Sequence, residues 1–214
     1  MKKAILFDMD GLLIDSERVT FETYQEILTR MGYVFTKSMY QGFVGSSKET
    51  VRQHFYDLFG AQFPLPQVEK ETHAIIEDCL FNHPPVKKGA MTLLSYLKKR
   101  QYKIMVASNS IQKRVVPVLK ASGIDAYIDG YICGDQVSRG KPDPELYLAC
   151  CQRLQISPKQ ALVLEDSEPG INAGYNAGID VICVPDIKYP SQKYIDMTTH
   201  IVNSLEDVIA YLEQ

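Results

Sequence analysis

The feature that most constrains the fold is a short apolar run near the N-terminus that ends abruptly in acidic residues. Ala4 to Phe7 are apolar, and Asp8, Asp10 and Gly11 follow within four residues. A continuous apolar run is typical of a strand buried on both faces, as in parallel sheets. Ligands of open α/β sheets bind at the carboxyl ends of such strands. Two close carboxylates there predict a divalent cation or a shared proton, unless both are solvated turn residues.

Further apolar runs alternate with helical patterns along the rest of the chain. The runs that predict strands cover residues 103–107, 131–133, 161–164 and 181–184. Strands that alternate with helices indicate a parallel sheet with helices on both faces. We therefore expect an α/β fold with a Rossmann-like, doubly wound parallel sheet.

Residues 16–85 depart from this alternation of strands and helices, because they contain helical patterns and no strong strand pattern. Ser46 and Glu49 have the spacing of a capping box, which predicts the start of a helix there. A Pro-Pro pair marks the end of the segment. We expect residues 1–15 and 86–214 to form a catalytic core, and residues 16–85 to form a helical cap inserted after the first strand.

The composition argues against several functional classes. The 214 residues carry a formal net charge of −3, so the chain lacks the basic surface typical of nucleic-acid binding. No apolar run approaches the ~18 residues of a membrane helix, and no signal-peptide pattern precedes the first strand. The five cysteines have no metal-binding spacing, which favours reduced, buried thiols. We expect a cytoplasmic monomer that binds neither nucleic acid nor membrane.

Polar groups recur where the predicted strands end. They are Asp8 and Asp10, Ser108, Lys141, and Glu165 with Asp166. One edge of a doubly wound sheet would gather these positions around a single ligand. Several carboxylates make an oxygen-only site that suits Mg²⁺ rather than zinc. A hydroxyl and an ammonium group supply donors for a dianion, so the set indicates phosphoryl transfer.

Each of these residues taken singly has an ordinary structural interpretation. Ser108 is also typical of a helix N-cap, and Lys141, which precedes a proline, of a solvated loop. Glu165 and Asp166 are typical of an acidic helix start. Their order along the chain favours one shared site over four separate coincidences.

The sequence resembles the haloacid dehalogenase superfamily, in the branch of β-phosphoglucomutase and its sugar-phosphate phosphatase relatives. The four family motifs are matched by residues 8–12, by Ser108, by Lys141 within Gly-Lys-Pro-Asp-Pro, and by residues 165–170. The family also places a small helical cap between its first and second motifs. The resemblance spans nearly the whole chain and implies a phosphoric monoester hydrolase with a Rossmann-like core.

The resemblance implies roles for the four carboxylates. Asp8 would be the nucleophile that takes the phosphoryl group. Asp10 would protonate the leaving oxygen and then deprotonate the attacking water. Mg²⁺ would be held by the Asp8 carboxylate, the Asp10 backbone carbonyl and Asp166, with Glu165 acting through a bound water.

The resemblance also implies how the substrate is held. Ser108, the backbone at Asn109, and Lys141 would bind the phosphoryl oxygens. Lys48 lies in a segment that resembles a substrate loop, so it is either a contact for a distal anionic group or an exposed helix-start lysine. Thr20 stands where the mutases have a histidine, which favours a phosphatase over a mutase.

We therefore expect a Mg²⁺-dependent phosphatase that hydrolyses a small phosphorylated metabolite, a sugar phosphate by resemblance, through an aspartyl phosphate. Dehalogenases and phosphonate hydrolases of the superfamily lack the second aspartate, whereas Asp10 is present here. A phosphomutase of the β-phosphoglucomutase type is the alternative enzyme. A receiver-like module that binds phosphate or Mg²⁺ without turnover is the alternative of another class, although receivers are shorter and lack a cap.

Overall fold

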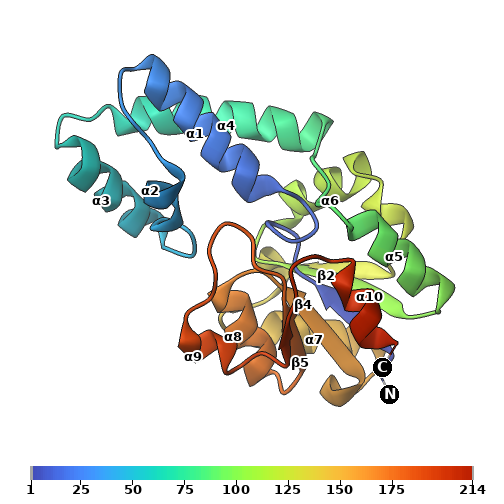
Figure 1. Cartoon of the computed structure of the whole chain (residues 1–214). Coiled ribbons are helices and arrows are strands. Elements are labelled where there is room, and N and C mark those ends of the chain that lie inside the picture. Colours follow the sequence, from blue (N-terminus) through green and yellow to red (C-terminus); the bar gives the residue numbers. More distant parts are fainter. Residues whose placement is uncertain (1, 214) are drawn as a thin grey trace.

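The computed structural model describes residues 2–213, which contain one six-stranded sheet in the order β3-β2-β1-β4-β5-β6 (Figure 1). All neighbouring strands are parallel. The strands are β1 (Ala4–Phe7), β2 (Lys103–Ser108), β3 (Gly130–Cys133), β4 (Ala161–Glu165), β5 (Asp180–Cys183) and β6 (His200–Ile201). The predicted doubly wound parallel sheet is confirmed, and the strand order reverses between β1 and β4, where such folds bind ligands.

The side chains of β1 alternate between the two faces of the sheet, and all four are fully buried. Ile5 and Phe7 belong to the hydrophobic cluster on one face, whereas Ala4 and Leu6 belong to the cluster on the other. Burial on both faces explains why this strand reads as a continuous apolar run.

Five helices cover the two faces of the sheet. The cluster that contains Phe7 also includes buried residues of α5 (Ala90–Lys99), α6 (Gln112–Ala121) and α10 (Asp207–Leu212). The opposite cluster includes buried residues of α7 (Glu145–Leu154) and α8 (Glu168–Asn176). The remaining short helices on this part of the chain are α9 (Gln192–Ile195), η1 (Ile124–Ala126), η2 (Gly134–Gln136) and η3 (Pro158–Gln160).

The segment between β1 and β2 begins with four helices that form a separate layer, which we call the helical insert (Figure 1). They are α1 (Ser16–Arg30), α2 (Lys37–Gln41), α3 (Lys48–Phe59) and α4 (Leu65–Asn82). The insert has its own buried cluster, rich in aromatic rings, and Phe55 lies within it with 0% exposure. The ring centroids of Phe43 and Phe63 lie 4.7 and 5.7 Å from that of Phe55. Ile187, from the loop after β5, is the core residue that joins this cluster.

The chain enters and leaves the helical insert side by side. The backbone N–H of Asp15 donates to Pro85 O, and that of Lys87 donates to Leu13 O, both at 2.8 Å. The ammonium of Lys87 forms ion pairs with Asp15, at 3.0 Å, and with Asp186. Both connections are therefore tied to each other and to the loop after β5.

The start of α3 differs from the predicted capping box. Ser47, in extended conformation, is the N-cap, and its hydroxyl accepts a hydrogen bond from the backbone N–H of Thr50 at 3.2 Å. Ser46 still belongs to the preceding turn, because its N–H donates to Phe43 O. The pairing of Ser46 with Glu49 was therefore wrong by one residue. Across the described part of the chain, no helix combines the length and apolarity needed to cross a membrane.

Candidate active site

Four of the predicted site residues lie at the carboxyl ends of three adjacent strands. Asp8 follows β1, Ser108 ends β2, Glu165 ends β4, and Asp166 comes next. All four side chains are buried. Buried carboxylates are costly unless they are paired with opposite charge or bound to a metal. The strand ends therefore hold a site that needs cations.

Lys141, from the loop before α7, supplies one of these cations. Its Nζ lies 2.5 Å from Asp8 Oδ1 and 2.6 Å from Glu165 Oε1. Nζ also lies 4.9 Å from the centroid of the Tyr147 ring, whose hydroxyl donates to Glu165 Oε1 at 2.7 Å. Burial alone would lower the pKa of Lys141, but Asp8 and Glu165 outweigh it and hold that pKa above its ordinary value. Lys141 is therefore a fixed ammonium group at neutral pH.

Glu165 is fixed through its second oxygen as well. Oε2 accepts hydrogen bonds from the backbone N–H of Asp166 and Ser167, at 3.1 and 3.2 Å, and from the Ser167 hydroxyl at 2.9 Å. A Cβ on Gly170 would lie 1.8 Å from Glu165 Oε1, so only glycine leaves room for this carboxylate. The geometry makes Glu165 the anchor that orients Lys141.

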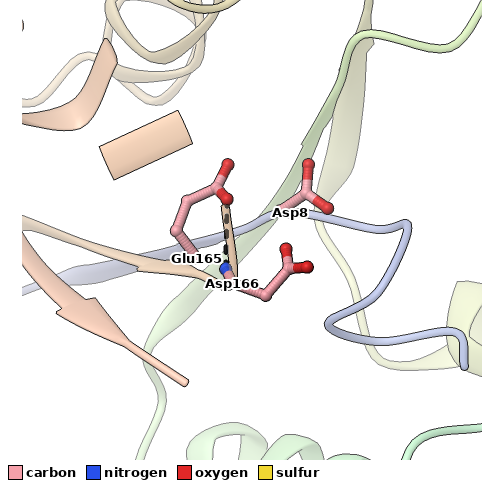
Figure 2. Close-up of side chains that lie close together, drawn as sticks. All are labelled: Asp8, Glu165 and Asp166. Atoms are coloured by element: carbon pink, nitrogen blue, oxygen red, sulfur yellow. Dashed lines mark hydrogen bonds between the residues drawn. The ribbon is translucent and has the colours of Figure 1, made fainter. Parts of the chain in front are cut away.

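A divalent cation fits the group formed by Asp8, Glu165 and Asp166. Each offers a carboxylate oxygen, and these three oxygens lie within 4.8 Å of one another (Figure 2). Asp166 Oδ1 is buried and has no hydrogen-bond partner among the described residues. An all-oxygen donor set of this kind suits a hard cation such as Mg²⁺ or Ca²⁺.

The electrostatics of the carboxylates agree with that fit. Burial raises the pKa of Asp8 to about 8, although the Lys141 ammonium opposes the shift. Burial, and then the charges of Glu165 and Asp8, raise the pKa of Asp166 well above its ordinary value. Carboxylates that resist ionisation in this way favour the binding of a further positive charge.

Gly11 allows Asp166 to reach this position. Its φ of +85° lies in the left-handed region, and a Cβ there would lie 2.3 Å from Asp166 Oδ2. Glycine is therefore required at position 11 for two physical reasons. The backbone turns there with a positive φ, and the Asp166 carboxylate approaches too closely for a Cβ.

Asp10 lies beside the group rather than in it, and two donors hold its carboxylate. The Ser110 hydroxyl donates to Oδ2 and Arg114 Nη2 donates to Oδ1, each at 3.0 Å. The sequence analysis missed Ser110, Arg114 and Tyr147. Ser110 lies two residues after Ser108, and Tyr147 lies six residues after Lys141, so closeness to the motifs in sequence is the signal that could have found these two.

Asn109 contacts the loop that contains Lys141. Its side-chain Nδ2 donates to Lys141 O at 3.1 Å, and its Oδ1 accepts from Lys141 N at 2.8 Å. A Cβ on Gly140 would lie 2.6 Å from Asn109 Oδ1, so the neighbouring glycine permits this pairing. The Ser108 hydroxyl accepts a hydrogen bond from Ser110 N at 3.0 Å.

Lys48 is not brought into this group. It is exposed at the first residue of α3, and its side chain forms no hydrogen bond or ion pair with residues 2–213. Thr20 uses its hydroxyl within α1, where it donates to Ser16 O at 2.8 Å. The site nevertheless borders the helical insert through a pocket that both parts line. Its lining residues are Gly42, Val44, Gly45 and Ser46 of the insert, and Asp166, Ser167, Glu168, Pro169, Lys188, Pro190 and Tyr194 of the core.

The doubly wound parallel sheet and its acidic, lysine-containing site define a Rossmann-like α/β enzyme with a helical insert after the first strand. Residues 5–184 match the model of one family in particular, described as haloacid dehalogenase-like hydrolase. The chain belongs to this family. The resemblance and the hydrolase class predicted from the sequence are confirmed.

Known relatives and structures are similar over most of their length. The chain is 29% identical over 184 residues to a phosphorylated carbohydrates phosphatase of Thermotoga maritima, and covers 83% of it with 84% of its own length. It is 33% identical over 180 residues to the validoxylamine A 7′-phosphate phosphatase of Streptomyces hygroscopicus subsp. limoneus, with 84% of each chain covered. A haloacid dehalogenase-like protein of Agrobacterium tumefaciens has a TM-score of 0.85 at 24% identity, over 100% of this chain and 98% of that one; this likeness concerns the fold alone.

Proposed function

We propose that this hydrolase is a Mg²⁺-dependent phosphatase that acts on a small phosphorylated metabolite of the sugar-phosphate class. The observation that carries the proposal is the contact of the buried Lys141 ammonium with Asp8, beside Ser108 and the unpartnered oxygen of Asp166. A phosphoryl group needs donors of this kind, together with a cation. Two relatives, which are phosphatases of phosphorylated carbohydrates and of validoxylamine A 7′-phosphate, support the substrate class.

The reaction would proceed in two displacements at phosphorus, in which Asp8 is first the nucleophile and then the leaving group. A carboxylate oxygen of Asp8 attacks phosphorus, the bond from phosphorus to the ester oxygen breaks, and Asp10 gives its proton to the departing oxygen. Water then attacks the phosphorus of the aspartyl phosphate, Asp10 takes a proton from this water, and the bond from phosphorus to the Asp8 oxygen breaks. Inorganic phosphate leaves, and both aspartates return to their starting states.

The remaining residues bind and orient. The Ser108 hydroxyl, the backbone N–H at Asn109 and the Lys141 ammonium would donate to phosphoryl oxygens, and Glu165 keeps Lys141 in place. The metal would be held by Asp8, Asp166 and the backbone carbonyl of Asp10, with Glu165 acting through a water. When bound, Mg²⁺ would neutralise negative charge on the phosphoryl oxygens.

We further propose that residues 16–85 act as a cap domain over a core formed by residues 1–15 and 86–214. The aromatic cluster of the helical insert supports this division, as do the paired connections at Asp15 and Pro85. A cap that opens and closes would admit substrate and then water in turn. The protein would work as a monomer in the cytoplasm without a nucleic-acid partner.

The test is a screen of phosphorylated metabolites for release of inorganic phosphate, with Mg²⁺ and with a chelator. We expect many phosphate molecules released per chain from at least one sugar phosphate, and none after chelation. A single phosphoryl group per chain would instead indicate a receiver-like module. No release from any phosphate ester, in the presence of Mg²⁺, would contradict the proposed function.

A further inference from the structure

We infer that Arg114 is a positioning residue of the reaction, which acts by holding the carboxylate of Asp10, with Ser110 as its companion. The inference rests on the proposed function, because it assumes that Asp10 transfers protons. It concerns a residue on α6 that lies outside the four motifs.

The contacts account for both oxygens of Asp10. Oδ1 accepts from Arg114 Nη2 and Oδ2 accepts from the Ser110 hydroxyl, each at 3.0 Å. A carboxylate with a directed donor on each oxygen cannot rotate without breaking one of the two hydrogen bonds. The donor on Oδ1 carries a full charge, and such hydrogen bonds are stronger than neutral ones.

Asp10 needs outside support because its own segment does not fix its side chain. It lies in the turn after β1 and precedes Gly11, whose φ is +85°. Its side chain is 26% exposed, so packing does not hold it in one orientation. Proton transfer depends on placement, and an error of about 1 Å can reduce a rate about 100-fold.

The location of the two donors links this support to the phosphate site. Ser110 lies in the loop that follows Ser108 at the end of β2, and Arg114 lies in the first turn of α6, directly after that loop. The segment that would bind the phosphoryl group thus also sets the position of the group that would protonate the leaving oxygen. Arg114 Nε is buried without a hydrogen-bond partner in residues 2–213, an arrangement that packing alone would not favour.

The test compares Arg114→Met and Arg114→Lys with Lys113→Met, which removes the adjacent, exposed cation of the same helix. Steady-state rates are measured on the best alkyl phosphate from the metabolite screen. We expect Arg114→Met to lower kcat about 10- to 100-fold, with KM changed less than about threefold. Arg114→Lys should recover part of that loss, and Lys113→Met should match the wild type.

The leaving group provides a signature that a purely structural role would not produce. The nitrophenolate of p-nitrophenyl phosphate departs without a proton, so the first displacement needs no acid. Arg114→Met should therefore retain a rapid burst of nitrophenolate and then turn over slowly, because hydrolysis of the aspartyl phosphate still needs Asp10. Loss of the burst to the same extent as the alkyl phosphate rate would overturn the inference.

A double variant tests whether Arg114 works through Asp10. In the Asp10→Asn background, Arg114→Met should have no further effect on the residual rate, because the carboxylate is already absent. A further loss of the same size would overturn the inference, as would a rise in KM at unchanged kcat, which would identify a direct anion contact. If a drop in melting temperature accompanies Arg114→Met, Ser110→Ala tests the same arrangement from the other oxygen, and an unchanged kcat there would count against it. Failure of the wild type to hydrolyse any phosphate ester would defeat the proposed function itself, and the inference with it.

Discussion

Asp8 and Asp10 are two residues apart, yet their surroundings suit them to different tasks. Asp8 is buried, and its carboxylate contacts Lys141 at 2.5 Å. The Asp10 side chain is 26% exposed and accepts hydrogen bonds from Ser110, in the β2–α6 connection, and from Arg114 on α6. A nucleophile has to be held in one place among cations, whereas a proton carrier has to reach the leaving oxygen and then water. The two environments match these two requirements.

Asp8→Asn should abolish turnover while the fold remains. The amide is nearly isosteric with the carboxylate, so Lys141 keeps a neighbouring oxygen, but an amide cannot attack phosphorus. Phosphate release should fall at least about 1,000-fold, with the melting temperature within a few degrees of the wild type. Radiolabelled or mass-shifted aspartyl phosphate should be trapped in the wild type and be absent from the variant. Rates like those of the wild type would refute the assignment of Asp8 as nucleophile.

Gly11→Ala should weaken metal binding more than it weakens the fold. The added Cβ would lie 2.3 Å from Asp166 Oδ2, at a φ of +85°, so the Asp166 carboxylate has to move. Gly32 is the matched control, since its φ is +83° and a Cβ there would have nothing within 4 Å. Both variants carry left-handed strain of about 1–2 kcal/mol.

Only Gly11→Ala should raise the Mg²⁺ concentration for half-maximal activity, by about tenfold or more, and metal binding followed by calorimetry should change in parallel. Equal metal dependence in the Gly11→Ala and Gly32→Ala variants would contradict the role of Asp166 as a ligand.

The site residues inside the motifs could be predicted from the sequence, whereas the residues that hold them in place could not. Asp8 and Glu165 could be predicted because they directly follow or end apolar runs that read as strands. Ser110, Arg114 and Tyr147 could not, because their contacts depend on how a loop and two helices approach the strand ends. No periodicity in the sequence encodes that approach.

Two connections join the helical insert to the core, one near Asp15 and one near Pro85, and Lys87 holds them together. Its ammonium pairs with Asp15 at one connection and with Asp186 in the loop after β5. Burial alone would raise the pKa of Asp15, but hydrogen bonds from Arg18 and Lys87 outweigh it and hold that pKa below its ordinary value. The connections are therefore joined by charge as well as by backbone hydrogen bonds.

Lys87→Met should lower the free energy of unfolding by about 1 kcal/mol at neutral pH, since the side chains are only partly shielded. The way this stability difference changes with pH follows from the lowered pKa of Asp15. Its lowered pKa gives stability that is fully present above the unfolded value of about 4, and lost as the pH falls through the lower folded pKa. Urea unfolding at pH 7, 5 and 3.5 should therefore show a smaller difference between wild type and variant at the lowest pH. Lys88→Met, on the exposed neighbour, is the control and should cost little.

Element types were easier to predict than element boundaries. The apolar runs predicted β1 to β5. A strand that is buried on both faces is apolar at successive positions, so it can be recognised from its own residues. β6 has only two residues, too few for any period, and it was missed. The start of α3 was misplaced by one residue, because Ser46 and Ser47 are equally good caps in sequence and the preceding turn decides between them.

The whole molecule consists of a sheet with two buried faces and a helical insert with a third buried cluster. Ile187 is the residue of the loop after β5 that packs into the insert's cluster, and Gln41 Nε2 donates to its backbone oxygen at 2.7 Å. The two parts therefore meet near the pocket that borders Asp166, and they meet again where α4 packs against α6.

The choice between water and a sugar as phosphoryl acceptor depends on this arrangement as a whole. A mutase has to retain a bisphosphate while it reorients, which calls for a second strong phosphate site in the helical insert. Thr20 donates to Ser16 O within its own helix, and the exposed Lys48 side chain forms no hydrogen bond or ion pair with residues 2–213. Neither supplies a buried cation opposite Lys141. A hydrolase would need only one phosphoryl site and access for water.

We therefore expect hydrolysis when β-glucose 1-phosphate is supplied with a trace of glucose 1,6-bisphosphate. Inorganic phosphate, from this or another sugar phosphate, should be the main product, and glucose 6-phosphate should stay minor. Thr20→His provides the informative comparison, because it restores at that position the residue type that the mutases have. If water is the acceptor because the helical insert lacks a second phosphate site, Thr20→His alone should leave water as the acceptor. A single histidine does not build such a site. Rapid formation of glucose 6-phosphate by the wild type, with negligible phosphate release, would establish the mutase instead.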